Sequence, residues 1–85
     1  MPHRNFPQEI TETELAAGFE LRSIGRGPDG THRLAAVCDL GGGLRAVKSF
    51  GPDGAIEYAI WAGTNVAVYF PARDLDDVRL RFPPR

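Results

Sequence analysis

The spacing of apolar and polar residues near the N-terminus indicates a short helix. Thr11 is followed three residues later by Glu14, which is the spacing of a capping box, where each side chain bonds the other residue's backbone amide. The alanines that follow favour a helix, and Gly18 suits the left-handed conformation after a helix end. The sequence therefore predicts a helix over residues 12–17, preceded by a tail over residues 1–8.

After this helix the pattern changes to short segments rich in β-branched and aromatic residues, separated by clusters of turn residues. The motif Gly-Pro-Asp-Gly occurs twice. In each copy Pro presets φ, Asp tolerates the next position, and Gly supplies the positive φ that closes a hairpin. The pattern predicts an antiparallel meander in which this motif is a connector used twice. The turn clusters lie at 27–30, 41–43, 51–54, 63–65 and Pro71.

Simple registers across two of these turns place opposite charges, or small apolar residues, across from each other. Cross-strand pairs of this kind stabilise a sheet. A bulge in either turn would shift the pairs by one residue. The predicted pairs are Lys48 with Glu57, Ala46 with Ala59, Asp39 with Arg45, and Val37 with Val47.

The final segment, 78–82, alternates apolar residues with arginine, which is the two-residue period of a half-exposed strand. It predicts a last strand at a sheet edge, with Arg79 and Arg81 in solvent. Two internal segments, 59–62 and 66–70, are apolar on both faces. A strongly bent sheet explains this, because one strand then serves two sides of the core.

The predicted fold is mainly β (α+β). A short N-terminal helix is followed by a five- to six-stranded antiparallel meander bent into a small barrel, within one domain over residues 9–85. This architecture is similar to SH3-like and Sm-like barrels. The similarity is one of architecture, and no family motif in the residues accompanies it.

Composition narrows the class of protein. The chain has 85 residues, of which 42% are hydrophobic and 25% charged, and its formal net charge is −1. These values are typical of one small folded domain. A protein that mainly binds the nucleic-acid backbone is expected to carry a clear basic excess, so the charge disfavours that class. With no signal peptide and no apolar run of membrane length in the sequence, we expect a cytoplasmic protein.

The residues that could carry chemistry do not form a catalytic or metal-binding set. Residues 41–43 lack the Lys and Ser/Thr that follow the glycines of a phosphate loop. Cys38 would need a neighbouring base, and His32 lies roughly 20 Å away along an extended strand, so we interpret Cys38 as a structural thiol. The acidic cluster over 74–77 is too short for a calcium loop and is interpreted as a solvated turn. The sequence therefore predicts no enzyme activity, no cofactor and no metal.

Aromatic residues of the strands, with basic residues near them in sequence, form a candidate surface for nucleic acid. Aromatic rings can stack on bases while a basic rim contacts the backbone. The competing interpretation is that these aromatics are simply the core, because so small a domain needs them, and the near-zero charge favours it. The candidate residues are Arg22, Arg33, Arg45, Lys48, Tyr58, Trp61 and Tyr69.

The sequence thus predicts a non-catalytic small binding protein that acts through protein–protein contacts, such as a regulatory subunit or a phage- or plasmid-encoded inhibitor of a larger host complex. The alternative is a single-stranded RNA- or DNA-binding barrel that uses the aromatic and arginine face. We expect a protein partner or self-association, with no membrane and no small-molecule substrate. The predicted binding or self-association surface lies along the charged C-terminal segment. Its residues are Arg73, Asp74, Asp76, Asp77, Arg79 and Arg81.

Overall fold

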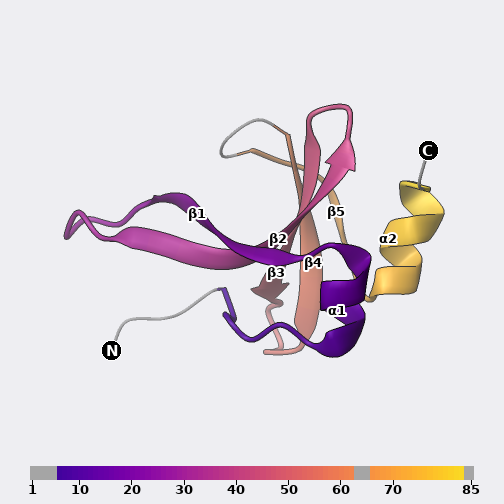
Figure 1. Cartoon of the computed structure of the whole chain (residues 1–85), viewed down its shortest axis with the longest axis horizontal. Coiled ribbons are helices and arrows are strands. Elements are labelled where there is room, and N and C mark those ends of the chain that lie inside the picture. The colour runs from indigo at the N-terminus through magenta and orange to yellow at the C-terminus, as the bar shows by residue number, and fades with distance from the viewer. Residues whose placement is uncertain (1–5, 63–65, 84–85) are drawn as a thin grey trace.

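A computed structural model defines residues 6–62 and 66–83, and the side chains of all of these except 66–70. Within these residues the chain forms one five-stranded antiparallel sheet, whose strands lie in the order of the chain, and two short helices. The mainly β meander predicted from the sequence is confirmed (Figure 1). The elements are α1 (Glu12–Ala17), β1 (Glu20–Arg26), β2 (His32–Gly41), β3 (Leu44–Phe50), β4 (Ile56–Ala62), β5 (Val66–Ala72) and α2 (Leu75–Arg81).

The sheet changes partners along β2, its longest strand. Residues 32–37 of β2 pair with β1, and residues 37–41 pair with β3. The outer part of the β1–β2 hairpin, residues 23–34, therefore extends away from the rest of the sheet, and we call it the β1–β2 arm (Figure 1). Among the described strands, β1 and β5 each have one neighbour. The sheet is not closed, so the predicted barrel is not confirmed.

The two Gly-Pro-Asp-Gly motifs form the same turn, as predicted. In the first, the Gly30 amide donates to the Gly27 carbonyl oxygen over 3.0 Å, and the Gly27 amide donates to the Thr31 carbonyl oxygen over 2.8 Å. The second motif repeats these two bonds over 2.9 Å and 2.7 Å. Its closing glycine, Gly54, has a φ of 82°, and Gly30 has a φ of 81°, a region that other residues rarely adopt. This is a three-residue hairpin loop with a bulge at the glycine.

Because of this bulge, the register of the β3–β4 hairpin differs by one residue from the predicted register. Lys48 pairs with Tyr58, and the predicted pair of Lys48 with Glu57 is wrong. The physical reason is that the closing glycine occupies one strand position without a partner opposite it, which shifts every later pair. The other corrected pair is Ala46 with Ile60, in place of Ala59.

The β2–β3 hairpin is closed by two residues, Gly42 and Gly43, with φ values of 63° and 79°. Two consecutive positive φ values define the type I′ turn, whose twist matches that of the flanking strands. The run of glycines is therefore a hairpin turn, as the sequence predicted. The register predicted for this hairpin is also confirmed, with Asp39 opposite Arg45 and Val37 opposite Val47.

The helix α1 begins and ends where the sequence predicted. The Thr11 hydroxyl accepts from the Glu14 amide over 3.2 Å, and the Glu14 carboxylate accepts from the Thr11 amide over 2.8 Å, so the capping box is complete. Gly18 adopts a φ of 104°, and its amide donates to the Leu15 carbonyl oxygen over 3.1 Å. A glycine in this conformation is a common way to satisfy the last carbonyl groups of a helix.

The C-terminal segment is a helix, so the predicted sixth strand over 78–82 is wrong. The Asp74 side chain accepts from the Asp77 amide over 2.8 Å and caps the first turn of α2. Acidic residues lie in that first turn and both arginines lie in the last turn, an order that the helix dipole favours.

Packing explains why residues 78–81 are helical although apolar residues alternate with arginine over 78–82 in the sequence. Leu75, Val78 and Phe82 recur at helical spacing and all contact the core on one side of α2. A strand would have buried Leu80 together with Val78, whereas in the helix Leu80 is exposed. The two arginines are therefore on a helix surface and not along a sheet edge.

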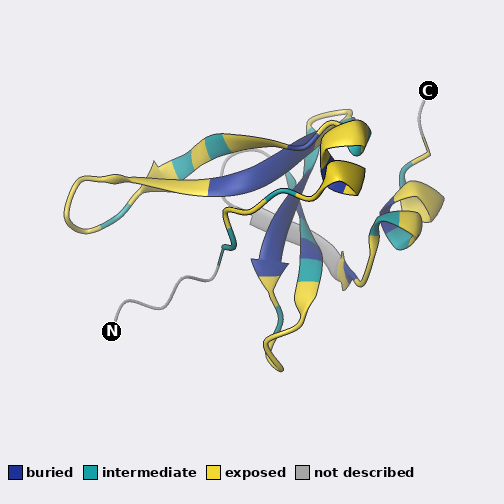
Figure 2. Cartoon of the chain, turned by 60° about the horizontal axis from the view of Figure 1, so that its bottom comes forward, coloured by how far each residue is buried: buried dark blue, intermediate teal, exposed yellow. Residues whose placement is uncertain are grey.

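The sheet buries apolar side chains on both faces. Figure 2 shows buried residues in the middle of β2 and in β3, whereas the β1–β2 arm is exposed towards its tip. Alternate residues of β2 serve the two faces. The cluster on the face that both helices cover consists of Phe19, Ala36, Cys38, Ala46, Tyr58, Ile60, Ala72 and Val78. The cluster on the opposite face consists of Ala35, Val37 and Val47, against which Phe6, Ile24 and Trp61 pack.

Replacement of Asp74 by Ala should lower the free energy of unfolding by about 1 kcal/mol, because α2 loses its N-cap. Asp76→Ala is the matched control, because it removes an exposed carboxylate from the same first turn and leaves the cap in place. The control should cost less than about 0.5 kcal/mol. Urea unfolding followed by far-UV circular dichroism measures both values, and equal effects would contradict a helix that begins after Asp74.

Candidate functional site

Glu14 is the most deeply buried charged residue in the described part of the chain, with 2% of its surface exposed. The capping box explains its position. Because the Glu14 side chain turns back to bond the Thr11 amide, its carboxylate lies at the start of α1, away from solvent. A carboxylate in this place needs further hydrogen-bond donors, since an unpaired buried charge is costly.

Two side chains from neighbouring strands supply these donors. Lys48 on β3 and Tyr58 on β4 are direct cross-strand partners, so both project from the sheet face that α1 covers. Lys48 Nζ donates to Glu14 Oε1 over 2.8 Å, and the Tyr58 hydroxyl donates to Glu14 Oε2 over 2.5 Å. Lys48 Nζ also donates to the Glu9 carbonyl oxygen over 2.8 Å. We call Glu14, Lys48 and Tyr58 the Glu14 cluster.

The electrostatics of the Glu14 cluster follow from burial and hydrogen bonding. Burial raises the pKa of Glu14, but hydrogen bonds from Lys48, Tyr58 and the Thr11 amide outweigh it and hold that pKa below its ordinary value. Burial, together with the neighbouring carboxylate, raises the pKa of Tyr58 far above its ordinary value. At neutral pH the Glu14 cluster therefore contains an ionised carboxylate and a neutral phenol.

This arrangement stabilises structure and is poorly suited to proton transfer. A general acid or base works best when its pKa lies near the working pH, and the pKa values of Glu14 and Tyr58 are both moved away from neutrality. Both carboxylate oxygens already accept hydrogen bonds, and every buried side-chain nitrogen and oxygen in the described residues has a partner. The Glu14 cluster joins the segment before α1, α1 itself, β3 and β4.

Cys38 lies on the same sheet face, under the C-terminal end of α1. It is buried, and its thiol donates to the Ala17 carbonyl oxygen over 3.3 Å. Burial raises the pKa of the thiol, and the charge of Asp39 raises it further, so the reactive thiolate is disfavoured. His32 contacts Ser23 on the β1–β2 arm instead, over 2.8 Å. These contacts support the interpretation of Cys38 as a structural thiol.

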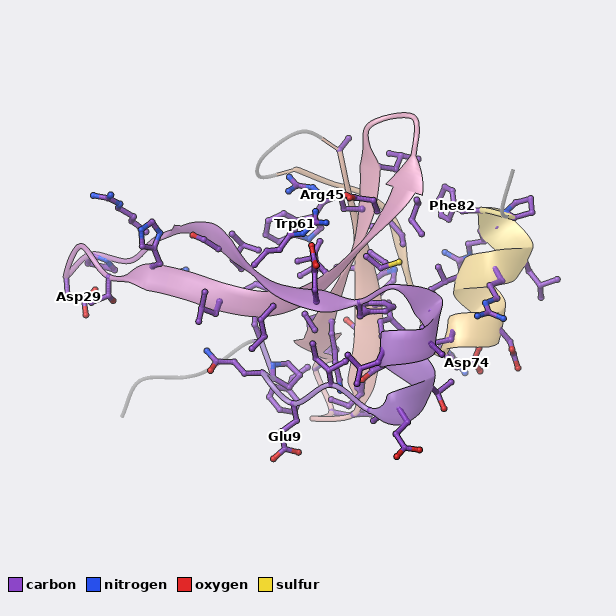
Figure 3. The ribbon with its side chains drawn as sticks, viewed as in Figure 1. Glu9, Asp29, Arg45, Trp61, Asp74 and Phe82 are labelled. Carbon is purple, nitrogen blue, oxygen red and sulfur yellow. The ribbon has the colours of Figure 1, made fainter. Side chains whose placement is uncertain are left out.

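The six residues predicted as a binding surface lie together on α2 and immediately before it. Figure 3 shows Asp74 at the start of this helix. The Arg73 amide donates to Asp77 Oδ2 over 3.3 Å, and Arg81 Nη2 lies 3.2 Å from the same oxygen. The helix therefore carries a local ion pair between Asp77 and Arg81. The remaining two residues, Asp76 and Arg79, are exposed.

The residues predicted as a nucleic-acid face do not share one surface. Lys48 and Tyr58 belong to the Glu14 cluster and are 5% and 6% exposed, so neither side chain is open to solvent for stacking. The corrected register contributes to this, because it places Tyr58 on the same face as Lys48, towards α1. Arg22 is paired with Glu20 over 2.6 Å and with Asp39 over 3.0 Å.

The other described members, Arg22, Arg33, Arg45 and Trp61, lie on the opposite face of the sheet, which is the face of Ala35 and Val37. Arg45 and Trp61 are cross-strand partners and both lie near the middle of the molecule (Figure 3). Trp61 packs edge-on against Phe6, with ring centroids 6.1 Å apart. Arg33 is exposed on the β1–β2 arm. The side chain of Tyr69 lies outside the described residues.

Sequence reasoning assigns Glu14 only to the helix cap and Lys48 to an exposed rim, and so it misses the Glu14 cluster. One signal points towards it. Lys48 is the only lysine in the chain and follows the apolar run Ala46-Val47 within a strand. A charge in such a place requires a buried partner, although the sequence alone does not say which acid supplies it.

Comparison of the chain with protein-family models, with curated proteins and with solved structures gives no match.

The helices α1 and α2 have six and seven residues. No helix within the described residues is long and apolar enough to span a bilayer. The same part of the chain contains no group of three or more His, Cys, Asp or Glu residues placed to hold a metal ion.

Replacement of Lys48 by Met should lower the free energy of unfolding by about 3 kcal/mol or more, because the Glu14 carboxylate stays buried without its counter-charge. Combining it with Glu14→Gln should recover part of this loss, because neither charge then remains. Chemical unfolding of the parent, the two single variants and the double variant gives the coupling energy. A double variant less stable than Lys48→Met alone would contradict a direct pairing.

The stability of the protein should depend on the ionisation of Glu14 at acidic pH. Because the pKa of Glu14 is lower in the folded than in the unfolded chain, the unfolded chain takes up the proton first as the pH falls. The stability that the ionised cluster contributes is present above about pH 4.3 and is lost as the pH falls through the lower folded-state pKa. Glu14→Gln should flatten this part of the profile of urea midpoint against pH. An unchanged slope in that variant would count against a lowered pKa of Glu14 in the folded chain.

Proposed function

We propose that the protein is a non-catalytic binding protein that acts through protein–protein contacts, such as a regulatory subunit or a phage- or plasmid-encoded inhibitor of a larger host complex. The observation that carries this proposal is the outer face of α2. Leu80 on this face is 83% exposed, the highest value among the large apolar residues found exposed. An apolar side chain surrounded by charged ones has the composition of a protein interface, with an apolar centre and a polar rim.

The residues around Leu80 fit this role. Asp76 lies one helical turn before Leu80 and shares its face, and Arg79 is its neighbour. Both are exposed, and arginine is enriched at interfaces, where its planar group pairs with carboxylates. The apolar side of α2 is already packed against the core through Leu75 and Val78. Leu80 is therefore not needed for packing, which leaves it available to a partner.

The same proposal includes a more specific architecture, a half-open barrel, and a location in the cytoplasm. A half-open barrel of the SH3-like or Sm-like kind is supported by the apolar clusters on both faces of the sheet and by the change of partners along β2. We place the protein in the cytoplasm, where the thiol of Cys38 stays reduced.

A second candidate function is binding to single-stranded RNA or DNA. It is favoured by one observation, the exposure of Arg26 and Arg33 on the β1–β2 arm, where Arg26 pairs with His32. Basic side chains on a projecting hairpin can contact phosphates. A gel-shift titration over a range of salt concentrations separates the two functions. A nucleic-acid complex must weaken as salt rises and must need Arg33.

Leu80→Glu should weaken binding to the protein partner by about tenfold or more, because it places a charge at the centre of the interface. Leu15→Glu is the matched control, because Leu15 is also exposed on a short helix, at 57%. The partner is recovered with the tagged parent chain from its native host, purified, and titrated against both variants by calorimetry. Equal affinities for the two variants would show that the outer face of α2 is not the binding surface.

A further inference from the structure

The strand β1 forms one edge of the sheet in the part of the chain that the structure describes, where β2 is its only partner. An edge strand presents backbone N–H and C=O groups that another strand can join. The C-terminal segment was predicted to supply such an edge, but it is helical, so the described edges are β1 and β5. The regular part of β1 runs from Glu20 to Ser23, because the register shifts between Ser23 and Gly25.

The side chains of this regular part alternate between the two faces of the sheet. Glu20 and Arg22 project from one face, and Leu21 projects from the other. Leu21 is 46% exposed. Arg22 Nε lies 2.6 Å from Glu20 Oε1, and Arg22 Nη2 lies 3.0 Å from Asp39 Oδ2. The edge therefore displays an acid and a base side by side on one face and an apolar side chain on the other.

We propose that β1 pairs antiparallel with β1 of a second copy of the chain, about a two-fold axis at Leu21. A two-fold axis places residues at equal distances from it in sequence opposite each other. Leu21 then faces the partner's Leu21. Glu20 faces the partner's Arg22, and Arg22 faces the partner's Glu20. Both backbone edges and both kinds of side chain are matched in this register.

The order of charges along β1 selects this register. An axis at Glu20 would set two carboxylates against each other, and an axis at Arg22 would set two guanidinium groups against each other, which is destabilising. An axis at Ser23 would meet the bulge before Gly25, where regular pairing ends. Within the regular part of the strand, the axis at Leu21 alone avoids like charges and the bulge.

Because the charges of β1 complement themselves, a second copy of this chain is a better partner for β1 than a strand of another protein. A foreign strand would need an acid and a base at matching positions, whereas this chain supplies both to itself. On the face of Leu21, Leu34 lies on the adjacent strand β2, diagonally across from it, and is also exposed. In the dimer, Leu21 and Leu34 from both copies would form a continuous apolar row, and one sheet would run through both copies.

Two charge variants test the proposal with the purified full chain. Glu20→Arg makes both charged positions of the strand positive, and Arg22→Glu makes both negative. Each variant alone should dimerise about 100-fold more weakly than the parent, because like charges then face each other. An equimolar mixture should form a heterodimer with about the parent's affinity, because opposite charges face each other again. Sedimentation velocity over a concentration series measures all three.

Glu12→Arg and Arg33→Glu are the matched controls, because they make the same changes of charge away from this edge, on α1 and β2. Both should dimerise like the parent, and circular dichroism confirms that each variant is folded. A parent that stays monomeric up to about 1 mM, single variants that dimerise like the parent, or a mixture that stays monomeric would each overturn the proposal. The result is independent of partner binding by α2, since Leu80→Glu should dimerise like the parent.

Discussion

The fold depends on the buried ion pair between Lys48 and Glu14, because this pair joins the N-terminal helix to the sheet. The helix α1 has six residues, whereas an isolated helix needs roughly 12–15 to be even marginally stable in water. Tertiary contacts must therefore hold it. The same ammonium group bonds the Glu9 carbonyl oxygen, so one side chain fixes the segment before the helix as well. Such a pair holds only while both charges are present, since either one alone would be buried without compensation.

The second Gly-Pro-Asp-Gly turn decides whether this ion pair can form. Its bulge places Lys48 opposite Tyr58, and both side chains then project to the face that α1 covers. Glu57, the partner that a simple register would give to Lys48, is opposite Ser49 and projects from the other face. Side chains alternate between faces, so a slip of one residue moves a whole strand's set to the other side. The positive φ of Gly54 thereby controls, through the register, which residues meet the buried carboxylate.

Local signals in this sequence predict local structure, but they do not identify residues that contact each other from distant positions in the chain. The capping box of α1 and the glycine turns each act over a few residues, so the first helix and the hairpins follow from sequence. The segment 78–82 is mispredicted because five alternating residues fit a strand, whereas a wider window, with the Asp74 cap and apolar residues at helical spacing, fits a helix. The Glu14 cluster joins residues 34 and 44 positions apart, and no local pattern identifies such partners. For the same reason the proposed α2 surface, which is contiguous in the chain, stays together, whereas Lys48 and Tyr58 separate from the other members of the face drawn from several strands.

An open sheet leaves this small domain with edges that a closed barrel would have paired. Both faces of the sheet already carry apolar clusters, so any further association can use the edges and the outer surfaces of the helices. On one side, β5 leads directly into α2, which packs beside it. On the other side, β1 presents alternating charges that complement themselves. Pairing there would add backbone hydrogen bonds without requiring a larger core, which suits a chain of 85 residues. Leu80 on the outer face of α2 is 83% exposed, so the proposed dimer would carry two copies of this face, and a partner with two matching sites would be bound with greater avidity than one copy could provide.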